Sequence, residues 1–408
     1  MTELPNGWHY RTLSEVCGLI TDGSHFSPKT QDSGYPYITV RDLNENGIDF
    51  TNCKFVSQES FDELEKNGCR PIIGDVLFSK DGTVGKVAQV LDKTKFVVLS
   101  SLAILRPNND FLTSEFLKYA LMSPVLLENA LGMKTGTALR RVVLRNLKTL
   151  EIPIPPMDEQ NKIVELLEDH LSRLDAALAD VKQAKTKAAQ FRASVLNSIF
   201  FDYGSKGWPL YKAADLGKWI TGSTPSSKVS DYVGTDVPFI TPGDIIDGGE
   251  IADYSRMISN SGADSVRRLR SNAVHLVCIG ATLGKVGIAR FESTSNQQIN
   301  ALEANEEIVL PDFAMWLLAS PAMQRELWDA SSSTTVPILN KGNLEKIEVR
   351  VPAISEQIKA LEEFDRASLT LEHLAKDFEI MLEKSNGLRR SILQAAFTGQ
   401  LTKEVVSV

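Results

Sequence analysis

Residues 137–164 read TALRRVVLRNLKTLEIPIPPMDEQNKIV, and residues 334–361 read TTVPILNKGNLEKIEVRVPAISEQIKAL. Both stretches contain Asn-Leu, an alternating apolar run, a proline and then Glu-Gln, all in the same register. An alternating run predicts a strand, and a proline before Glu-Gln predicts the beginning of a helix. The same strand-to-helix junction therefore occurs twice in the chain.

The repeat extends outward from this junction in both directions. Phe116 matches Phe313 and Phe200 matches Phe397, at a constant separation of 197 residues. Nearer the start of each copy the match continues with small gaps, and it pairs Gly7-Trp8 with Gly207-Trp208, Ile20-Thr21 with Ile220-Thr221, 36–39 with 238–241, and 83–87 with 282–286. A shared framework whose gaps fall in loops predicts two related modules that bind different targets.

Each copy divides into a globule and a helix. Short β-rich runs, such as 37–40, 76–78 and 97–99, alternate with Gly, Asn and Asp turns, whereas 157–199 contains neither proline nor glycine. The predicted fold class is α+β, with an internal pseudo-two-fold repeat. The predicted boundaries are 1–153 for the first mixed α/β domain, 154–203 for the first spacer helix, 204–351 for the second domain, and 352–408 for the second helix and tail.

The two predicted helices carry apolar residues at heptad spacing. In the first helix, one series is Leu167, Leu174, Val181, Ala188 and Val195, and a second series three residues further on is His170, Ala177, Ala184, Phe191 and Ser198. The second helix repeats the pattern over 354–382 and resumes beyond Gly387. Both helices are acidic first and basic last, which favours an antiparallel coiled coil. At about 1.5 Å per residue each helix would be roughly 65 Å long.

Composition limits the classes of function. Apolar content of 43% and charged content of 24% are ordinary globular values, and no apolar run is long enough to cross a bilayer. The first ten residues lack the pattern of a secretory signal, which predicts a cytoplasmic protein. The four cysteines and five histidines show no metal-ligand spacing, so we expect no metal and no disulfide. His170 is interpreted as a packed helix residue.

The doubled junction, the opening Gly-Trp and the Gly-Lys-Val hairpins resemble the specificity subunits of type I restriction-modification enzymes. The resemblance covers the whole chain. It implies two target-recognition domains, each reading one half of a bipartite, asymmetric target in double-stranded DNA. It also implies that two modification subunits dock on the helices, bring S-adenosylmethionine and methylate adenine at N6. Restriction subunits can then join through them. The chain itself would carry no cofactor and no catalytic group.

Enzyme motifs are missing from the residues. The Pro-Pro pair at 155–156 has Ile154 before it and Met157 after it, so it is not the Asn/Asp-Pro-Pro-Tyr/Phe motif of an adenine methyltransferase. No Asp/Glu-x-Lys triplet follows Pro311-Asp312 as a nuclease would require. The segment 280–286 resembles a phosphate loop but lacks its spacing and the Ser or Thr after lysine, which favours a tight hairpin.

Net charge must be weighed against a DNA partner. The total of −8 is unfavourable for phosphate contacts, but acidic residues concentrate in the first half of the first helix. No acidic residue lies between Glu128 and Glu151, and Arg267, Arg268 and Arg270 form a smaller basic cluster. An alternative stays open, namely a structural coiled-coil protein whose globules bind protein or a glycan.

DNA contacts are expected from polar and basic residues on the repeated loops. In the first domain the candidates are Thr21, Ser24, His25, Lys29, Thr39, Arg41, Lys80, Lys86, Lys134, Thr135, Gly136, Thr137, Arg140 and Arg141. In the second domain they are Thr221, Ser223, Thr224, Thr241, Lys285, Asn296, Gln297, Gln298, Ser332, Thr334, Thr335 and Lys341. The pair Gln297-Gln298 fits strand surface as well as it fits base contacts. Arg140 and Arg141 are expected to contact phosphates, and the alternative for them is a solvated surface.

Overall fold

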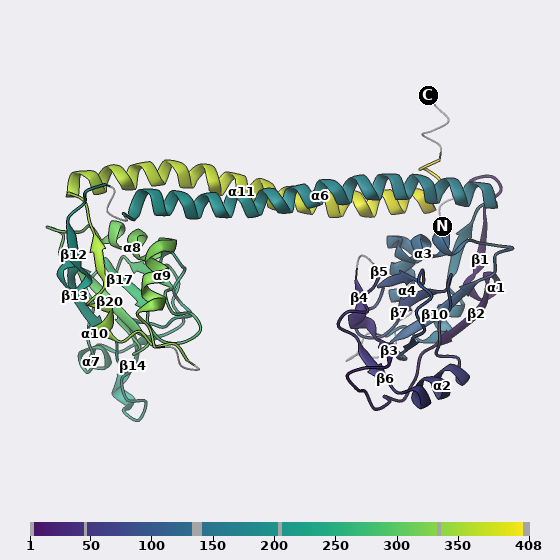
Figure 1. Ribbon diagram of the computed structural model, residues 1–408, viewed down its shortest axis with the longest axis horizontal. Coiled ribbons are helices and arrows are strands. Elements are labelled where there is room, and N and C mark those ends of the chain that lie inside the picture. Colours follow the sequence, from purple (N-terminus) through teal and green to yellow (C-terminus); the bar gives the residue numbers. More distant parts are fainter. Residues whose placement is uncertain (1–3, 45–46, 133–140, 203–205, 333–335, 403–408) are drawn as a thin grey trace. The chain divides into compact units, whose positions relative to one another are not determined.

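The computed structural model describes residues 4–44, 47–132, 141–202, 206–332 and 336–402 (Figure 1). The chain forms two compact units. Unit 1 contains Met1–Val181 and Ile380–Val408, and unit 2 contains Lys182–Glu379. Each unit therefore combines one globule with one half of each long helix.

A four-stranded antiparallel sheet forms the centre of unit 1. Its order is β2 (Cys17–Asp22), β10 (Leu102–Pro107), β7 (Val76–Ser79) and β8 (Val87–Gln89). Residues 76–78 of β7 and 102–105 of β10 are all apolar and buried because both faces of the sheet are covered. Phe78 and Leu105 pack with the helices, and Leu77 and Ile104 pack against the loops and strands on the other face.

Smaller elements surround this sheet. Strand β3 (Tyr35–Ile38) lies between β6 (Lys54–Val56) and β9 (Val97–Val98), in the three-stranded sheet beside the centre. The run predicted as a strand over 37–40 ends at Ile38 because Thr39 caps a short 3-10 helix, η1 (Val40–Asp42). The remaining elements are β1 (His9–Thr12), α1 (Leu13–Val16), β4 (Leu43–Asn44), β5 (Gly47–Ile48), α2 (Gln58–Lys66), α3 (Ser114–Met122), α4 (Pro124–Gly132), α5 (Leu144–Lys148) and β11 (Glu151–Ile154).

Unit 2 repeats the plan with one more strand in its central sheet. The order is β13 (Gly217–Thr221), β20 (Ile299–Ala304), β17 (Ala273–Val277), β18 (Val286–Ala289) and β15 (Gly249–Glu250). Its other elements are β12 (Leu210–Lys212), η2 (Ala213–Leu216), η3 (Ser230–Tyr232), β14 (Val233–Ile240), β16 (Met257–Ile258), α7 (Asn260–Asp264), β19 (Thr294–Ser295), α8 (Pro311–Ala319), α9 (Pro321–Asp329), α10 (Lys341–Leu344) and β21 (Glu348–Arg350). Two related α+β globules are therefore present, as the repeat predicted.

The long helices α6 (Met157–Phe200) and α11 (Ile354–Phe397) pair antiparallel within each unit. In unit 1, Ile163 near the start of α6 shares a core with Phe397 at the end of α11. In unit 2, Phe200 at the end of α6 packs edge-on against Phe364 near the start of α11, with ring centroids 5.2 Å apart. The predicted antiparallel arrangement is confirmed.

A buried glutamine fastens the start of each helix to its globule, which explains the repeated Glu-Gln. The Gln160 amide accepts a hydrogen bond from the Thr113 N–H and donates to the carbonyls of Phe111 and Pro155. Gln357 makes the same three bonds, from the Leu310 N–H and to the carbonyls of Ile308 and Pro352. The oxygen and the nitrogen of each buried side-chain amide therefore have hydrogen-bond partners, as burial requires.

Two predictions about the helices were wrong. The break expected near Gly387 does not occur: α11 is continuous, since a glycine in a long helix costs only about 1 kcal/mol. The first heptad series is buried or half-buried, but His170 is exposed and Phe191 is 60% exposed. The second packed row lies four residues after the first instead of three, at Leu171 and Leu178, because both positions neighbour the first row on a helix and the leucines are the apolar ones.

Candidate nucleic-acid interface

Five segments of unit 1 meet at one end of its central sheet, and we call them loop face 1: residues 22–25, 39–42, 80–86, 98–101 and 141–142. Backbone hydrogen bonds hold them together. The Ser24 N–H donates to the Val98 carbonyl at 2.9 Å, the Lys80 N–H donates to the Ser101 carbonyl at 2.9 Å, and the Val142 N–H donates to the Lys80 carbonyl at 2.8 Å. Candidates that are distant in sequence are thereby brought together.

A row of alternating charges runs across loop face 1. The buried Lys80 ammonium lies 3.3 Å from Asp22 Oδ2 and 3.1 Å from Asp81 Oδ2. On one side, Asp22 Oδ2 is 3.3 Å from His25 Nε2; on the other, Asp81 Oδ1 is 3.4 Å from Arg141 Nε. The side chains of His25 and Arg141 are more than half exposed, whereas that of Lys80 is 2% exposed. This burial argues against the prediction that Lys80 contacts DNA directly. The Lys80 ammonium instead balances the charges of Asp22 and Asp81.

Other candidates of unit 1 divide into framework and surface. Thr39 donates its hydroxyl hydrogen to Asp42 at 2.8 Å, and Lys86 donates to the carbonyls of Val40 and Leu43 at 3.1 and 2.6 Å, so both fix the loop that follows β3. Thr21 is half-buried, and Ser24 is buried and closes a turn by donating to the Phe26 carbonyl. Lys29 and Arg41 are exposed.

Unit 2 contains the equivalent loop face 2, made of residues 221–224, 241–244, 278–285, 295–298 and 336–339. Its bonds match those of loop face 1. The Ser223 N–H donates to the Ser295 carbonyl at 2.8 Å, the Cys278 N–H donates to the Gln298 carbonyl at 2.7 Å, and the Leu339 N–H donates to the Cys278 carbonyl at 2.8 Å.

Strand pairing corrects one part of the predicted repeat. Asp22 pairs with Ala103 in unit 1, and Thr221 pairs with Asn300 at the matching place in unit 2. Asp22 is therefore the structural counterpart of Thr221, and the proposed match of Thr21 with Thr221 is one residue out of register. By the same hydrogen bonds, Cys278 replaces Lys80.

The remaining charged positions are also neutral in unit 2. The backbone bridge between Asp81 and Arg141 is formed by Ile279 and Ile338 in unit 2. Thr221 donates its hydroxyl hydrogen to Asn300 Oδ1 at 2.6 Å, and burial raises the pKa of the Cys278 thiol to about 11, so the thiol is uncharged. Loop face 2 thus has a neutral polar centre on the same backbone.

Several candidates of unit 2 are hydrogen-bonded to other residues of loop face 2. Thr224 donates to Gln297 at 2.7 Å, and the Asn296 amide donates to Gln298 at 3.1 Å. Thr241 donates to Asp244 as Thr39 does to Asp42, and Lys285 donates to the Pro242 carbonyl at 3.3 Å. Ser223 is half-buried, while Thr224, Gln297, Ser332 and Lys341 are exposed. Lys341 lies 3.4 Å from Glu345, one turn along α10.

Several candidates lie outside the described residues. They are Lys134, Thr135, Gly136, Thr137 and Arg140 in the first domain, and Thr334 and Thr335 in the second. Of these two segments, the structure describes only the flanking candidates Arg141 and Ser332.

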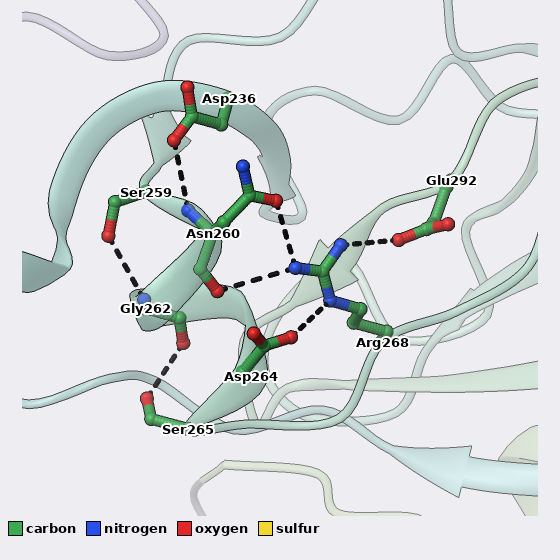
Figure 2. Close-up of polar contacts among 8 residues, drawn as sticks. All are labelled: Asp236, Ser259, Asn260, Gly262, Asp264, Ser265, Arg268 and Glu292. Carbon is green, nitrogen blue, oxygen red and sulfur yellow. Dashed lines mark hydrogen bonds and ion pairs between the residues drawn. The ribbon is translucent and has the colours of Figure 1, made fainter.

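The basic cluster expected at Arg267, Arg268 and Arg270 is not a free cationic patch. Figure 2 shows the Arg268 guanidinium bonded to Asp264 and Glu292 at 2.7 and 2.6 Å, and to the backbone and side chain of Asn260. These bonds fasten the start and end of α7 to Glu292, two residues before β19. Arg267 donates to the Thr221 carbonyl, and Arg270 donates to the Ala304 carbonyl. All three are engaged in holding the globule together.

Three residues in or directly beside loop face 1 were missed by the sequence reasoning. Asp22 and Asp81 were left out because acidic side chains repel phosphates, and their shared ammonium becomes visible only when the loops meet. Phe26 is 84% exposed beside His25, and an exposed aromatic next to polar loop residues was a usable signal.

Both halves of the chain match a known protein family. The type I restriction modification DNA specificity domain matches residues 5–183 and again residues 205–380. The chain belongs to the family of type I restriction-modification specificity subunits. The two matches coincide with the two halves of the repeat.

Relatives in this family match along almost the whole chain. A putative type I restriction enzyme MjaX specificity subunit from Methanocaldococcus jannaschii is 23% identical, covering 98% of this chain and 95% of the relative. The EcoKI specificity subunit of Escherichia coli is 21% identical, covering 98% and 91%.

Solved structures share the fold. A chain from a study of complex assembly and conformational transition of the type I R-M system matches with a TM-score of 0.75 and 18% identity, covering 98% of this chain and all of that one. The HsdS subunit from Thermoanaerobacter tengcongensis matches with a TM-score of 0.59 and 20% identity, covering 98% of each chain. Specificity subunits of this family therefore share the two-module α+β architecture.

Among the described residues, no group of His, Cys, Asp and Glu side chains could hold a metal ion. Cys17, Cys53, Cys69 and Cys278 are buried free thiols. Within the same part of the chain, none of the helices combines the length and apolarity that a membrane span requires.

Proposed function

We propose that the chain recognises a bipartite, asymmetric sequence in double-stranded DNA, with loop face 1 reading one half and loop face 2 the other. The observation that carries this proposal is that the two units share one backbone arrangement of their loops but carry different side chains on it. A shared frame holds the loops in the same way in both units, while exposed groups such as Arg141 and Gln297 differ. Different half-sites, and a full target that is not a palindrome, follow from that difference.

Docking of two adenine-N6 methyltransferase subunits on the helices is the second part of the proposal. In unit 1, α11 exposes Ile380, Met381 and Leu388, and in unit 2, α11 exposes Leu369 and Leu374 beside polar neighbours. Exposed apolar side chains on paired helices are typical of surfaces that bind protein. Restriction subunits would join through the methyltransferase subunits.

The chain is proposed to be non-catalytic. In this scheme S-adenosylmethionine belongs to the docked methyltransferase subunits, which supply the methyl group, and the chain's own residues position the DNA. The assembly would act in the cytoplasm, where the chromosome is accessible.

The test is an exchange of one recognition domain. The chain is co-expressed with the methyltransferase subunit of its own system, and methylated motifs are mapped by sequencing. Replacing residues 1–153 with the equivalent domain of a relative should change one half-site and leave the other unchanged. A contiguous motif, a change in both half-sites, or methyl transfer by the purified chain alone would contradict the proposal. Binding to a protein or glycan with no preference among duplexes would favour the structural alternative.

A further inference from the structure

We propose that Arg141 reads a guanine in the half-site of unit 1, with Asp81 and the buried Lys80 as positioning residues. This inference rests on the proposed function and assigns one specificity-determining contact within it. It differs from the expectation, drawn from the sequence, that Arg141 contacts phosphates.

The first support is the orientation of the guanidinium. Asp81 Oδ1 lies 3.4 Å from Arg141 Nε, the nitrogen nearest the chain. Among the described residues, no other ion pair or hydrogen bond engages this guanidinium, whose side chain is 51% exposed. Its two terminal amines are therefore free to form the paired contact to guanine O6 and N7 that arginine commonly makes in the major groove.

The second support is that the backbone and the ion pairs that hold Arg141 are well fixed. A backbone bridge joins Asp81 to Arg141, and the next N–H, of Val142, donates to the Lys80 carbonyl at 2.8 Å. Asp81 is itself held by the Lys80 ammonium at 3.1 Å, and that ammonium is fixed from the other side by Asp22. A side chain that is held before binding loses less conformational freedom on binding.

The third support is electrostatic. Two carboxylates, Asp22 and Asp81, lie at loop face 1, and each is only partly buried. A carboxylate beside an arginine weakens its attraction for a phosphate, whose charge is also negative. A base edge carries no net charge, and a carboxylate can also accept a hydrogen bond from the amino group of cytosine or adenine. The arrangement therefore suits base contact better than phosphate contact.

The fourth support is that the fold does not need these charges. Unit 2 builds the same loops with Cys278, Ile279 and Ile338 in place of Lys80, Asp81 and Arg141. Burying an ammonium with two carboxylates is rarely the most stable solution when apolar side chains fit the same space. The charged row is thus a property of one recognition surface, and the half-site read by unit 2 lacks this guanine contact.

The test measures base preference and phosphate contact separately. The complex of the full chain with its methyltransferase subunits selects duplexes from a randomised library, which defines the half-site of unit 1. Affinities are then measured for the selected duplex and for duplexes with single base-pair changes, at several salt concentrations. The variants are Arg141→Lys, which keeps the charge but not the paired geometry, and Arg141→Ile, which copies unit 2.

We expect both variants to lose preference for one G·C pair by about 5- to 150-fold, the range for one paired contact. Preference at the other positions, and throughout the other half-site, should be unchanged. Asp81→Asn should weaken preference at the same pair by a smaller factor. The matched control is Arg11→Ile, an arginine whose side chain is 50% exposed and lies 3.9 Å from Glu15 but which is outside loop face 1; it should leave base preference unchanged.

Three results would overturn the inference. If Arg141→Lys keeps the wild-type preference and Arg141→Ile weakens binding to all duplexes equally with a shallower salt dependence, Arg141 contacts phosphate and the proposed function stands. If the wild-type complex selects no sequence at all, the proposed function fails together with the inference. Preference lost at both half-sites would also contradict it, because the change would then act through the whole assembly.

Discussion

Lys80 in unit 1 and Cys278 in unit 2 occupy the same place, since the carbonyl of each accepts a hydrogen bond from a matching backbone N–H, that of Val142 or Leu339. Around Lys80 the neighbours are charged, and around Cys278 they are neutral. Backbone hydrogen bonds are the same in both units, so the backbone does not dictate this choice. The repeat therefore sets the framework, and a few buried and half-buried side chains set the chemistry of each loop face.

Exchanging the two buried residues tests this comparison most severely. Cys278→Lys places an ammonium in a site whose neighbours, Thr221 and Asn300, carry no charge, and should destabilise unit 2 by about 3–5 kcal/mol. Lys80→Cys leaves Asp22 and Asp81 without their shared cation. Because both carboxylates are partly exposed, water screens them and the loss should be smaller, about 2 kcal/mol.

The measurement is urea unfolding of the full chain, with hydrogen exchange of peptides covering 76–105 and 273–304 to locate the effect. Adding Asp22→Asn and Asp81→Asn to Lys80→Cys should recover most of the lost stability, since it reproduces the neutral solution of unit 2. Equal losses from the two single substitutions, or no recovery in the triple variant, would show that the environments are not as different as their neighbours indicate.

A second difference between the units is a histidine in the central sheet. His275 in β17 is fully buried, with Nδ1 3.1 Å from the Ala273 carbonyl and Nε2 3.3 Å from Ser293 Oγ. Burial lowers the pKa of His275 to about 4. Because its pKa is near 6.5 when the chain is unfolded, the unfolded state takes up a proton first as the pH falls. The free energy of unfolding of unit 2 should therefore fall between about pH 6.5 and pH 4, by at most about 3 kcal/mol.

Unit 1 has Leu77 at the matching place in its sheet, so it lacks this particular dependence. His275→Leu copies unit 1 and should remove that part of the pH dependence of unit 2, while carboxylates that titrate in the same range contribute equally to both proteins. The difference between the two unfolding curves across pH isolates the histidine. Parallel curves would mean that His275 is protonated, or equally accessible, in both states.

Most of the framework was predictable because it depends on local sequence patterns. The repeat gave two related modules, the proline and Glu-Gln marked the beginning of each helix, and the order of charges favoured antiparallel pairing. Buried Gln160 and Gln357 explain why that motif is repeated. The second heptad series failed because it was placed three residues after the first instead of four: both positions lie beside the first row on a helix, and Leu171 was passed over for His170.

The candidate sites were predictable only as loops. Sequence located four of the five segments that meet at loop face 1, all but 98–101, and did not show which side chains turn inward there. Lys80 and Lys86 looked like surface cations and are tied to carboxylates or carbonyls, because neighbouring loops supply partners that no local pattern reveals. Arg268 was likewise read as part of a basic patch, although Glu292, far along the chain, neutralises it.

The smallest expected effects come from the ion pairs between the long helices, one in each unit. Arg389 contacts Asp175 in unit 1, and Lys185 contacts Glu379 in unit 2. The side chains of Asp175, Lys185 and Glu379 are more than half exposed, so water and salt screen them. Double-mutant cycles with Asp175→Asn and Arg389→Gln, and with Lys185→Gln and Glu379→Gln, should give coupling energies of about 0.5 kcal/mol or less. Raising the salt concentration to about 1 M should reduce both further, because the screening length falls to about 3 Å. Small values in both units would mean that the pairing of the helices depends on packed residues such as Phe364 and Phe397. A coupling energy above about 1 kcal/mol that persists at high salt would instead show that the order of charges helps to cause the antiparallel pairing.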